Sequence, residues 1–313
     1  MRRHSLPIGL LALACGLLAH AAPARAAAAT WVSGTGTNAG NCPITAPCRT
    51  FRFAYGRTDA GGVINVLSSG SFGPLTITKS ISIVADGVEA LIRGAGSIGA
   101  AIEIQAGASD VVSLRGLTID LHGTDNDGIS FVSGAALHVH NSVIRNSRYG
   151  ILFAPASGTS ELHVTDLVIA DTNADGIRFQ PAVSGSALAI LDRVRVENAS
   201  DAGIVISGTV TTGSVAATVR DSVSAGAAGS GIVAQESGSG TTTVMTDRTA
   251  SVNNGTGIYA IGAAATIRIG DSTVTGNGTG LNTGNSGTIA SYATNKVNGN
   301  GTNGDPTSVI DMK

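Results

Sequence analysis

One dipeptide, glycine followed by isoleucine or leucine, recurs along most of this chain with gaps of 22 to 28 residues. Its copies are Gly128-Ile129, Gly150-Ile151, Gly176-Ile177, Gly203-Ile204, Gly231-Ile232, Gly257-Ile258 and Gly280-Leu281. A period of this length is typical of stacked structural repeats, because one repeat is too short to bury its apolar face alone. The sequence therefore predicts a solenoid.

A strand pattern precedes each glycine marker. The segment Leu137-His-Val139-His-Asn141 aligns with Leu162-His-Val164-Thr-Asp166, and later copies keep the same alternation. Apolar residues that alternate with variable ones over four or five positions predict a strand. Asn, Asp and Gly between these runs predict turns, because their side chains tolerate unusual backbone angles.

The repeat length fits three short strands whose connecting turns leave no room for crossover helices. Such repeats wind as coils of a parallel β-helix, in which strands of successive coils pair about 4.8 Å apart and inward side chains stack. One coil would point Leu137, Val139, Ile144 and Ile151 inward. The predicted fold is all-β: a single-stranded right-handed parallel β-helix.

With these repeats, residues 60 to 300 resemble the right-handed parallel β-helix superfamily that includes pectate lyases and polygalacturonases. The resemblance implies the fold and does not carry over any catalytic residue. Polygalacturonase-like members have Asp-Asp, Gly-His-Gly and Arg-Ile-Lys motifs that this chain lacks, and Asp175-Gly176-Ile177 matches only the backbone part of their Asn-Thr-Asp motif. The Asp-Pro-His-Asp of alginate epimerases is absent as well.

The first 26 residues are predicted to be a secretory signal peptide. Arg2 and Arg3 precede an apolar run, and Ala24-Arg-Ala26 offers a cleavage site. No other segment has 18 consecutive apolar residues, so no membrane span is predicted. We expect the mature protein to be secreted or periplasmic.

Residues 27–60 are predicted to cap the first coil, ahead of the repeats over 61–313. Cys42 and Cys48 are the only cysteine pair left after export and predict a short disulfide-closed loop. Two thiols with no further Cys or His nearby do not complete a zinc site. The cap also holds Trp31 and Phe51, which suit a cover over the exposed coil.

Charge excludes one class of partner. Removal of Arg2, Arg3 and Arg25 leaves 16 Lys and Arg against 21 Asp and Glu. The chain has no basic stripe with interleaved aromatic residues, so nucleic-acid binding is not predicted.

The candidate ligand-binding residues gather between positions 113 and 180. They are Arg115, His138, His140, His163 and Arg145. The strand register places His138 and His140 on one strand face, with His163 one coil away. Three alternatives remain open for them: contact with an acidic sugar, a plain solvated surface, or a metal ion held by His138, His140 and His163.

The candidate catalytic residues lie in and beside the turns before the glycine markers. The carboxylates among them are Asp125, Asp127, Asp171 and Asp175, and the cation is Arg178, which follows the marker Gly176-Ile177. Paired carboxylates on neighbouring coils suit glycoside hydrolysis, and a carboxylate cluster with an arginine suits calcium-assisted β-elimination. The competing interpretation is that Asp before Gly simply closes a turn.

These observations predict an exported, monomeric β-helix that binds polysaccharide or another extracellular surface, including cell-surface glycans, without catalysis. The alternative is a polysaccharide lyase or glycoside hydrolase that acts on an acidic, uronate-containing glycan. No resident cofactor is expected for the binding protein, whereas a lyase would use calcium.

Overall fold

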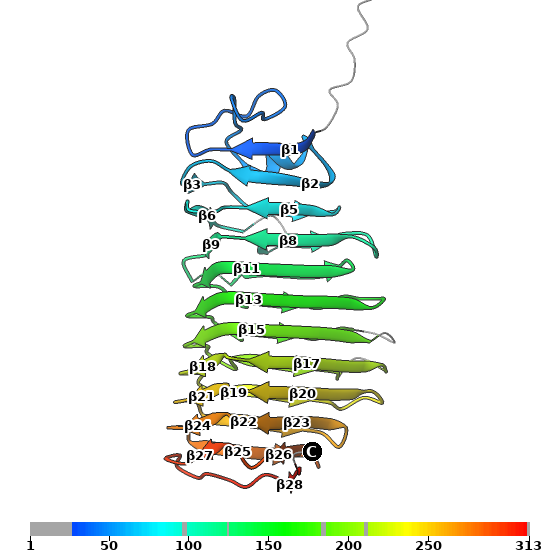
Figure 1. Ribbon diagram of the computed structural model, residues 1–313, viewed down its shortest axis with the longest axis vertical. Coiled ribbons are helices and arrows are strands. Elements are labelled where there is room, and N and C mark those ends of the chain that lie inside the picture. The colour runs from blue at the N-terminus through cyan, green and yellow to red at the C-terminus, as the bar shows by residue number, and fades with distance from the viewer. Residues whose placement is uncertain (1–26, 96–98, 124, 183–185, 210–211, 312–313) are drawn as a thin grey trace, which may run out of the picture.

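The computed structural model describes residues 27–311 apart from 96–98, 124, 183–185 and 210–211. The predicted signal peptide therefore lies outside the described residues. Figure 1 shows a column of stacked coils that runs from β1 at one end to β28 at the other. Strands of successive coils pair in parallel, so the predicted all-β parallel β-helix is confirmed.

Each coil has three sides. The strands of the first side are β1 (Ala27–Val32), β2 (Thr58–Val66), β5 (Ile81–Val84), β8 (Val111–Arg115), the first halves of β11 (Ala136–Arg145), β13 (Ser160–Ala170) and β15 (Ala187–Glu197), then β17 (Ser214–Arg220), β20 (Thr241–Asp247), β23 (Ala265–Gly270), β26 (Thr288–Ser291) and β28 (Ser308–Val309). The strands of the second side are β3 (Gly70–Ser71), β6 (Ala90–Arg93), β9 (Leu117–Asp120), the second halves of β11, β13 and β15, β18 (Val223–Ala225), β21 (Ala250–Val252), β24 (Thr273–Thr275) and β27 (Lys296–Val297).

The third side is a separate sheet, with nine strands among the described residues. They are β4 (Leu75–Ile77), β7 (Ala100–Gln105), β10 (Asp127–Ser133), β12 (Ile151–Phe153), β14 (Ile177–Phe179), β16 (Ile204–Ser207), β19 (Ser230–Gln235), β22 (Thr256–Ile261) and β25 (Thr279–Gly284). A glycine marker lies at or beside the start of each strand from β10 onward. A Cβ on Gly176 would lie 2.7 Å from the carbonyl oxygen of Gly203, so the coils approach too closely for a larger residue.

The first and second sides are joined by a bend of one residue in the left-handed backbone region. Its occupants are Asn141, Asp166, Arg193, Asp221, Arg248 and Asp271, with φ between 44° and 55°. Asn and Asp are the residues expected there. Arginine at two of these positions is not predicted by turn chemistry.

Inward side chains form one continuous core. The four residues predicted to point inward, Leu137, Val139, Ile144 and Ile151, are all fully buried. Beside them the Phe153 ring stacks on Phe131 and Phe179, with centroid distances of 4.3 and 4.7 Å. Stacked rings in successive coils bury large apolar surface and fix the register between coils.

A second, polar ladder runs inside the C-terminal coils. The Asn254 side chain donates to Asn277 Oδ1 over 3.0 Å, and Asn277 donates to Asn300 Oδ1 over 2.9 Å. Asn254 and Asn277 are almost fully buried. The Gly- and Asn-rich C-terminal repeats thus add hydrogen bonds between coils to the apolar stacking of residues such as Ile267 and Ile289.

The N-terminal end is covered by the loop from 33 to 50 and the one-turn helix α1 (Phe51–Tyr55). The predicted disulfide joins Cys42 to Cys48 and closes part of this loop. Strand β1, which lies within the predicted cap, pairs in parallel with β2, so the sheet already begins at Ala27. None of the helices in the described residues is long and apolar enough to span a membrane.

Candidate functional site

The predicted histidine cluster forms on the first side of the coils. His138 on β11 lies beside His163 on β13 in register, and their rings are stacked with centroids 4.7 Å apart. His140 lies 6.1 Å from His138 along β11 and pairs with Arg115 of β8. We call His138, His140, His163 and Arg115 the histidine strip.

The histidine strip is held by carboxylates and partly shielded from water. The imidazole of His163 contacts Glu161 at 2.9 Å, and Arg115 donates to Asp86 at 2.7 Å. Burial lowers the pKa of His138, and the neighbouring His163 and His140 lower it further. Burial also lowers the pKa of His140, with Arg115 as the second cause. Both shifts favour the uncharged form of these two rings.

The strip does not have the geometry of a metal centre. The rings of His138 and His163 are stacked face to face, only 6° from parallel. Over the described part of the chain, no three His, Cys, Asp or Glu side chains are placed to hold a metal ion.

Arg145, the fifth predicted ligand residue, is separated from the strip. It lies on the second half of β11, beyond the bend at Asn141, and donates to Asp120 at 2.9 Å. A ligand on the first side would have to pass around this bend to reach its guanidinium.

The predicted catalytic carboxylates separate into two kinds. Asp125 and Asp171 are exposed. Asp171 occupies a left-handed turn position, with φ of 56°, and accepts from the Asn198 side chain at 3.0 Å. The turn-closing role considered in the sequence analysis therefore applies to Asp171.

Asp127 and Asp175 are buried, and each is paired with an arginine. Arg148 donates two hydrogen bonds to Asp127, of 2.9 and 3.0 Å. Arg178 donates to Asp175 at 2.6 Å, and the Asp175 side chain is 0% exposed. Burial raises the pKa of the Asp175 carboxyl, although Arg178 opposes this shift. These carboxylates position arginines and do not face the solvent.

The two arginines flank one aromatic ring. The guanidinium carbons of Arg148 and Arg178 lie 5.0 and 5.6 Å from the centre of the Tyr149 ring. Arg178 is part of β14, and it points outward in the same column as Leu152 and Val205. The outer surface of the third side thus carries a Tyr–Arg cluster around β12 and β14.

A pocket of about 200 Å³ continues this surface toward the C-terminus. Val205 and Val233 point outward from the sheet, yet they are only 3% and 8% exposed. They pack with Ala202 and the half-buried Tyr259 in a small apolar cluster outside the main core. The polar residues around this floor are Arg178, Asp201, Ser230 and Gln235. We call this site the third-side pocket.

Sequence reasoning missed the third-side pocket, although a signal was present. A strand with one solvent-exposed face is expected to alternate apolar and polar residues, and this alternation is broken at Ile204-Val205-Ile206 and Ile232-Val233-Ala234. An apolar residue at an outward position indicates a covered or binding surface.

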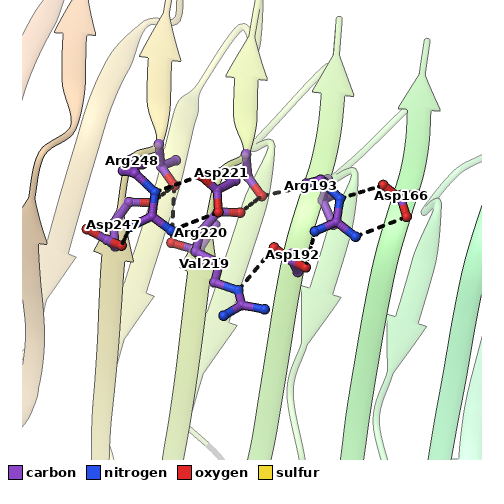
Figure 2. A network of polar contacts seen from close by, with 11 residues as sticks. Asp166, Asp192, Arg193, Val219, Arg220, Asp221, Asp247 and Arg248 are labelled. Carbon is purple, nitrogen blue, oxygen red and sulfur yellow. Dashed lines mark hydrogen bonds and ion pairs between the residues drawn. The ribbon is translucent and has the colours of Figure 1, made fainter.

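A charged network at the bend was also missed. Figure 2 shows Asp and Arg side chains linked from coil to coil, and its members are Asp166, Asp192, Arg193, Arg220, Asp221, Asp247 and Arg248. Arg193 donates two hydrogen bonds to Asp166, of 2.7 and 3.1 Å. The opposite charges pair with one another along this network, which explains why arginines occupy two of the bend positions. Because the charges are paired, little net charge remains to attract a ligand.

The lowered histidine pKa values lead to a prediction for Arg115→Gln. Loss of the cation beside His140 is expected to raise the pKa of His140 without raising that of His138, because Arg115 lowers the pKa of His140 directly, whereas the neighbours that lower the pKa of His138 are His163 and His140. The titration of the ring protons by NMR measures both. An equal shift of the two rings, or no shift, would contradict this assignment.

The same pKa shifts determine how the stability of the fold changes with pH. A histidine whose folded pKa lies below its unfolded value of about 6.5 stabilises the fold above that pH, and this contribution is lost as the pH falls toward the folded pKa. Unfolding measured between neutral and mildly acid pH is therefore expected to show a loss of stability, and the loss should be smaller in Arg115→Gln.

The fold places this chain among known proteins. The chain matches solved structures titled rhamnogalacturonan lyase (TM-score 0.57, 13% identity, 84% of this chain and 75% of that one) and pectate lyase Pel9A (TM-score 0.53, 17% identity, 84% and 74%). At these identities the likeness shows the fold alone. No curated protein matches the chain in sequence. A family model described as "Right handed beta helix region" matches residues 100–300, so this chain belongs to the right-handed β-helix family.

Proposed function

We propose that this chain is an exported β-helix protein that binds an acidic polysaccharide at the third-side pocket and does not cleave it. The observation that carries the proposal is the pocket itself. It combines an apolar floor, an aromatic wall at Tyr259 and the guanidinium of Arg178 on one outer surface. A sugar presents both apolar C–H faces and polar hydroxyl groups, which such a lining can accept together.

Two partly exposed arginines on this surface offer hydrogen-bond donors to the carboxylate of a sugar. Arg178 keeps a 22% exposed side chain beside the pocket, and Arg148 lies one coil away with 39% exposed. Because Asp175 and Asp127 orient these guanidiniums from below, their remaining N–H groups are available to an anion. The strands run across the column about 4.8 Å apart, so an extended glycan along the ladder would contact successive coils.

We prefer binding over catalysis because the buried candidate carboxylates are already paired with arginines. The two buried candidates, Asp127 and Asp175, are engaged by arginines and do not line an open cleft. Solenoids commonly bind partners along such lateral surfaces.

Replacement of the pocket wall tests the proposal. Tyr259→Ala and Arg178→Gln are each expected to weaken binding of an oligogalacturonate at least about tenfold, which corresponds to about 1.4 kcal/mol. Calorimetric titration of the folded variants measures the loss. The control is the double variant His138→Ala and His163→Ala on the other side of the coils, which should bind as the parent does. If only the control loses binding, the glycan site is the histidine strip, and the pocket proposal fails.

One observation favours the lyase alternative. Asp201 is an exposed carboxylate that lines the pocket beside Arg178. In β-elimination Asp201 would act as the base, and Arg178 would neutralise the carboxylate of the sugar. The solved structures similar in fold carry lyase titles. Incubation with polygalacturonate, with and without calcium, would release unsaturated ends if the chain is a lyase. Asp201→Asn should then abolish that release.

Export is part of the proposal. Residues 1–26 would be removed as a signal peptide, and the Cys42–Cys48 disulfide suits an oxidising compartment. Mass spectrometry of the exported protein tests this directly, with cleavage after Ala26 as the expected result.

A further inference from the structure

The N-terminal cap carries a second pocket, which the glycan site on the third side does not explain. It has a volume of about 300 Å³ and is lined by Asn38, Thr50, Arg52, Phe53, Gly56 and Arg57. It lies between α1 and the loop that contains the disulfide. The third-side pocket is built from β14, β16, β19 and β22, many coils away along the column (Figure 1).

The walls of the cap pocket are held in place before any ligand arrives. The Asn38 side chain accepts from the backbone N–H groups of Arg49 and Thr50, at 2.9 and 3.1 Å. Arg57 donates through Nε to the carbonyl oxygen of Gly40 at 3.1 Å, and its guanidinium carbon lies 4.7 Å from the centre of the Phe53 ring. Arg57 is therefore oriented by its backbone and ring contacts, and its terminal N–H groups remain for other partners.

The cap differs from the repeats in its charge. Residues 27–60 contain three arginines and one acidic residue, whereas residues 61–313 contain 13 Lys and Arg against 20 Asp and Glu. In the repeats most arginines pair with a carboxylate, such as Arg145 with Asp120. Within the described residues, no ion pair joins Arg52 or Arg57 to a carboxylate. Two unpaired guanidiniums in one pocket attract an anion.

We propose that the cap pocket is a second binding site, for a sugar that carries a carboxylate. Arg52 and Arg57 would hold the carboxylate through charge-assisted hydrogen bonds. The Phe53 ring and the apolar stem of Arg52 would contact the C–H face of the sugar, which a small inorganic anion does not have. The site does not depend on the third-side pocket, and together the two would anchor one polymer at two points.

The test uses the full mature chain with a uniform ¹⁵N label. Titration with trigalacturonate is expected to shift the amide signals of Asn38, Thr50, Phe53 and Gly56. In the double variant Arg52→Gln and Arg57→Gln these shifts should require at least tenfold more ligand. The matched control is Arg268→Gln, which removes an exposed arginine outside the cap and should leave them unchanged. The remaining amide signals report whether each variant is folded.

The outcomes are distinct. Shifts confined to residues around Val205 and Val233 would overturn the cap site and leave the third-side pocket intact. Cap shifts that persist in the double variant would also overturn it. A parallel titration with inorganic phosphate separates the ligand classes, because equal or tighter binding of phosphate would refute the assignment of a carboxylated sugar.

Discussion

Ile177→Asp is expected to destabilise the coils around β14 by about 4 kcal/mol. Ile177 is fully buried and stacks in register between Ile151 and Ile204. A carboxylate at this position has no cation inside the core, so the fold must either bury an unpaired charge or open locally. Because each coil contacts mainly its neighbours, the loss should be concentrated there. Thermal unfolding and amide hydrogen exchange of residues 150–206 measure the effect.

The matched control is Leu152→Asp, which places the same charge on the neighbouring column of the same sheet. Leu152 points outward and is partly exposed. We expect a cost below about 1 kcal/mol, as is usual for a surface substitution. Equal destabilisation by the two variants would mean that the inward and outward columns have been assigned incorrectly.

Asn277→Ala is expected to cost about 2 to 3 kcal/mol. Asn277 Oδ1 accepts from both the backbone N–H and the side-chain amide of Asn254, at 2.8 and 3.0 Å. Alanine leaves the buried backbone N–H of Asn254 without an acceptor, whereas the side-chain amide of Asn254 keeps the Ser224 carbonyl oxygen and Ser251 Oγ. The hydrogen bonds that the Asn277 amide donates to the Ser251 carbonyl oxygen and to Asn300 are lost as well. Chemical denaturation of the mature protein measures the change. Asn282→Ala removes an exposed asparagine that points outward from β25, and its unfolding midpoint should match that of the parent.

If the two asparagine variants unfold alike, the internal ladder does not stabilise the C-terminal coils. A selective loss in Asn277→Ala would instead show that hydrogen bonds between coils stabilise the C-terminal coils, which lack the stacked aromatic rings of the central region. The stacked rings of Phe131, Phe153 and Phe179 have no counterpart among the described residues of the C-terminal coils, whose larger core residues are aliphatic, such as Ile267, Leu281 and Ile289.

For the candidate sites, the sequence predicted which residues lie beside one another on paired strands, but it did not predict how deeply each residue is buried. The alignment of repeats placed His138 beside His163 and His140 beside Arg115, because strands of equal repeats pair at equal positions. The same alignment could not show that Asp175 is fully buried under Arg178. Burial of a turn residue depends on how the next coil covers it, and the pattern of a single repeat does not contain that information.

The sequence by itself determined the stacking, the inward columns and the disulfide-closed cap. The glycine marker, the alternation of apolar residues and one cysteine pair are local patterns, and each has few structural solutions. Only the tertiary structure decided which outward residues meet. Val205, Val233 and Tyr259 come from three coils, and Arg52 and Arg57 line one pocket together with Asn38 of the preceding loop. Pockets of this kind depend on side chains from separate segments, so they follow from the packing of coils and not from any one repeat.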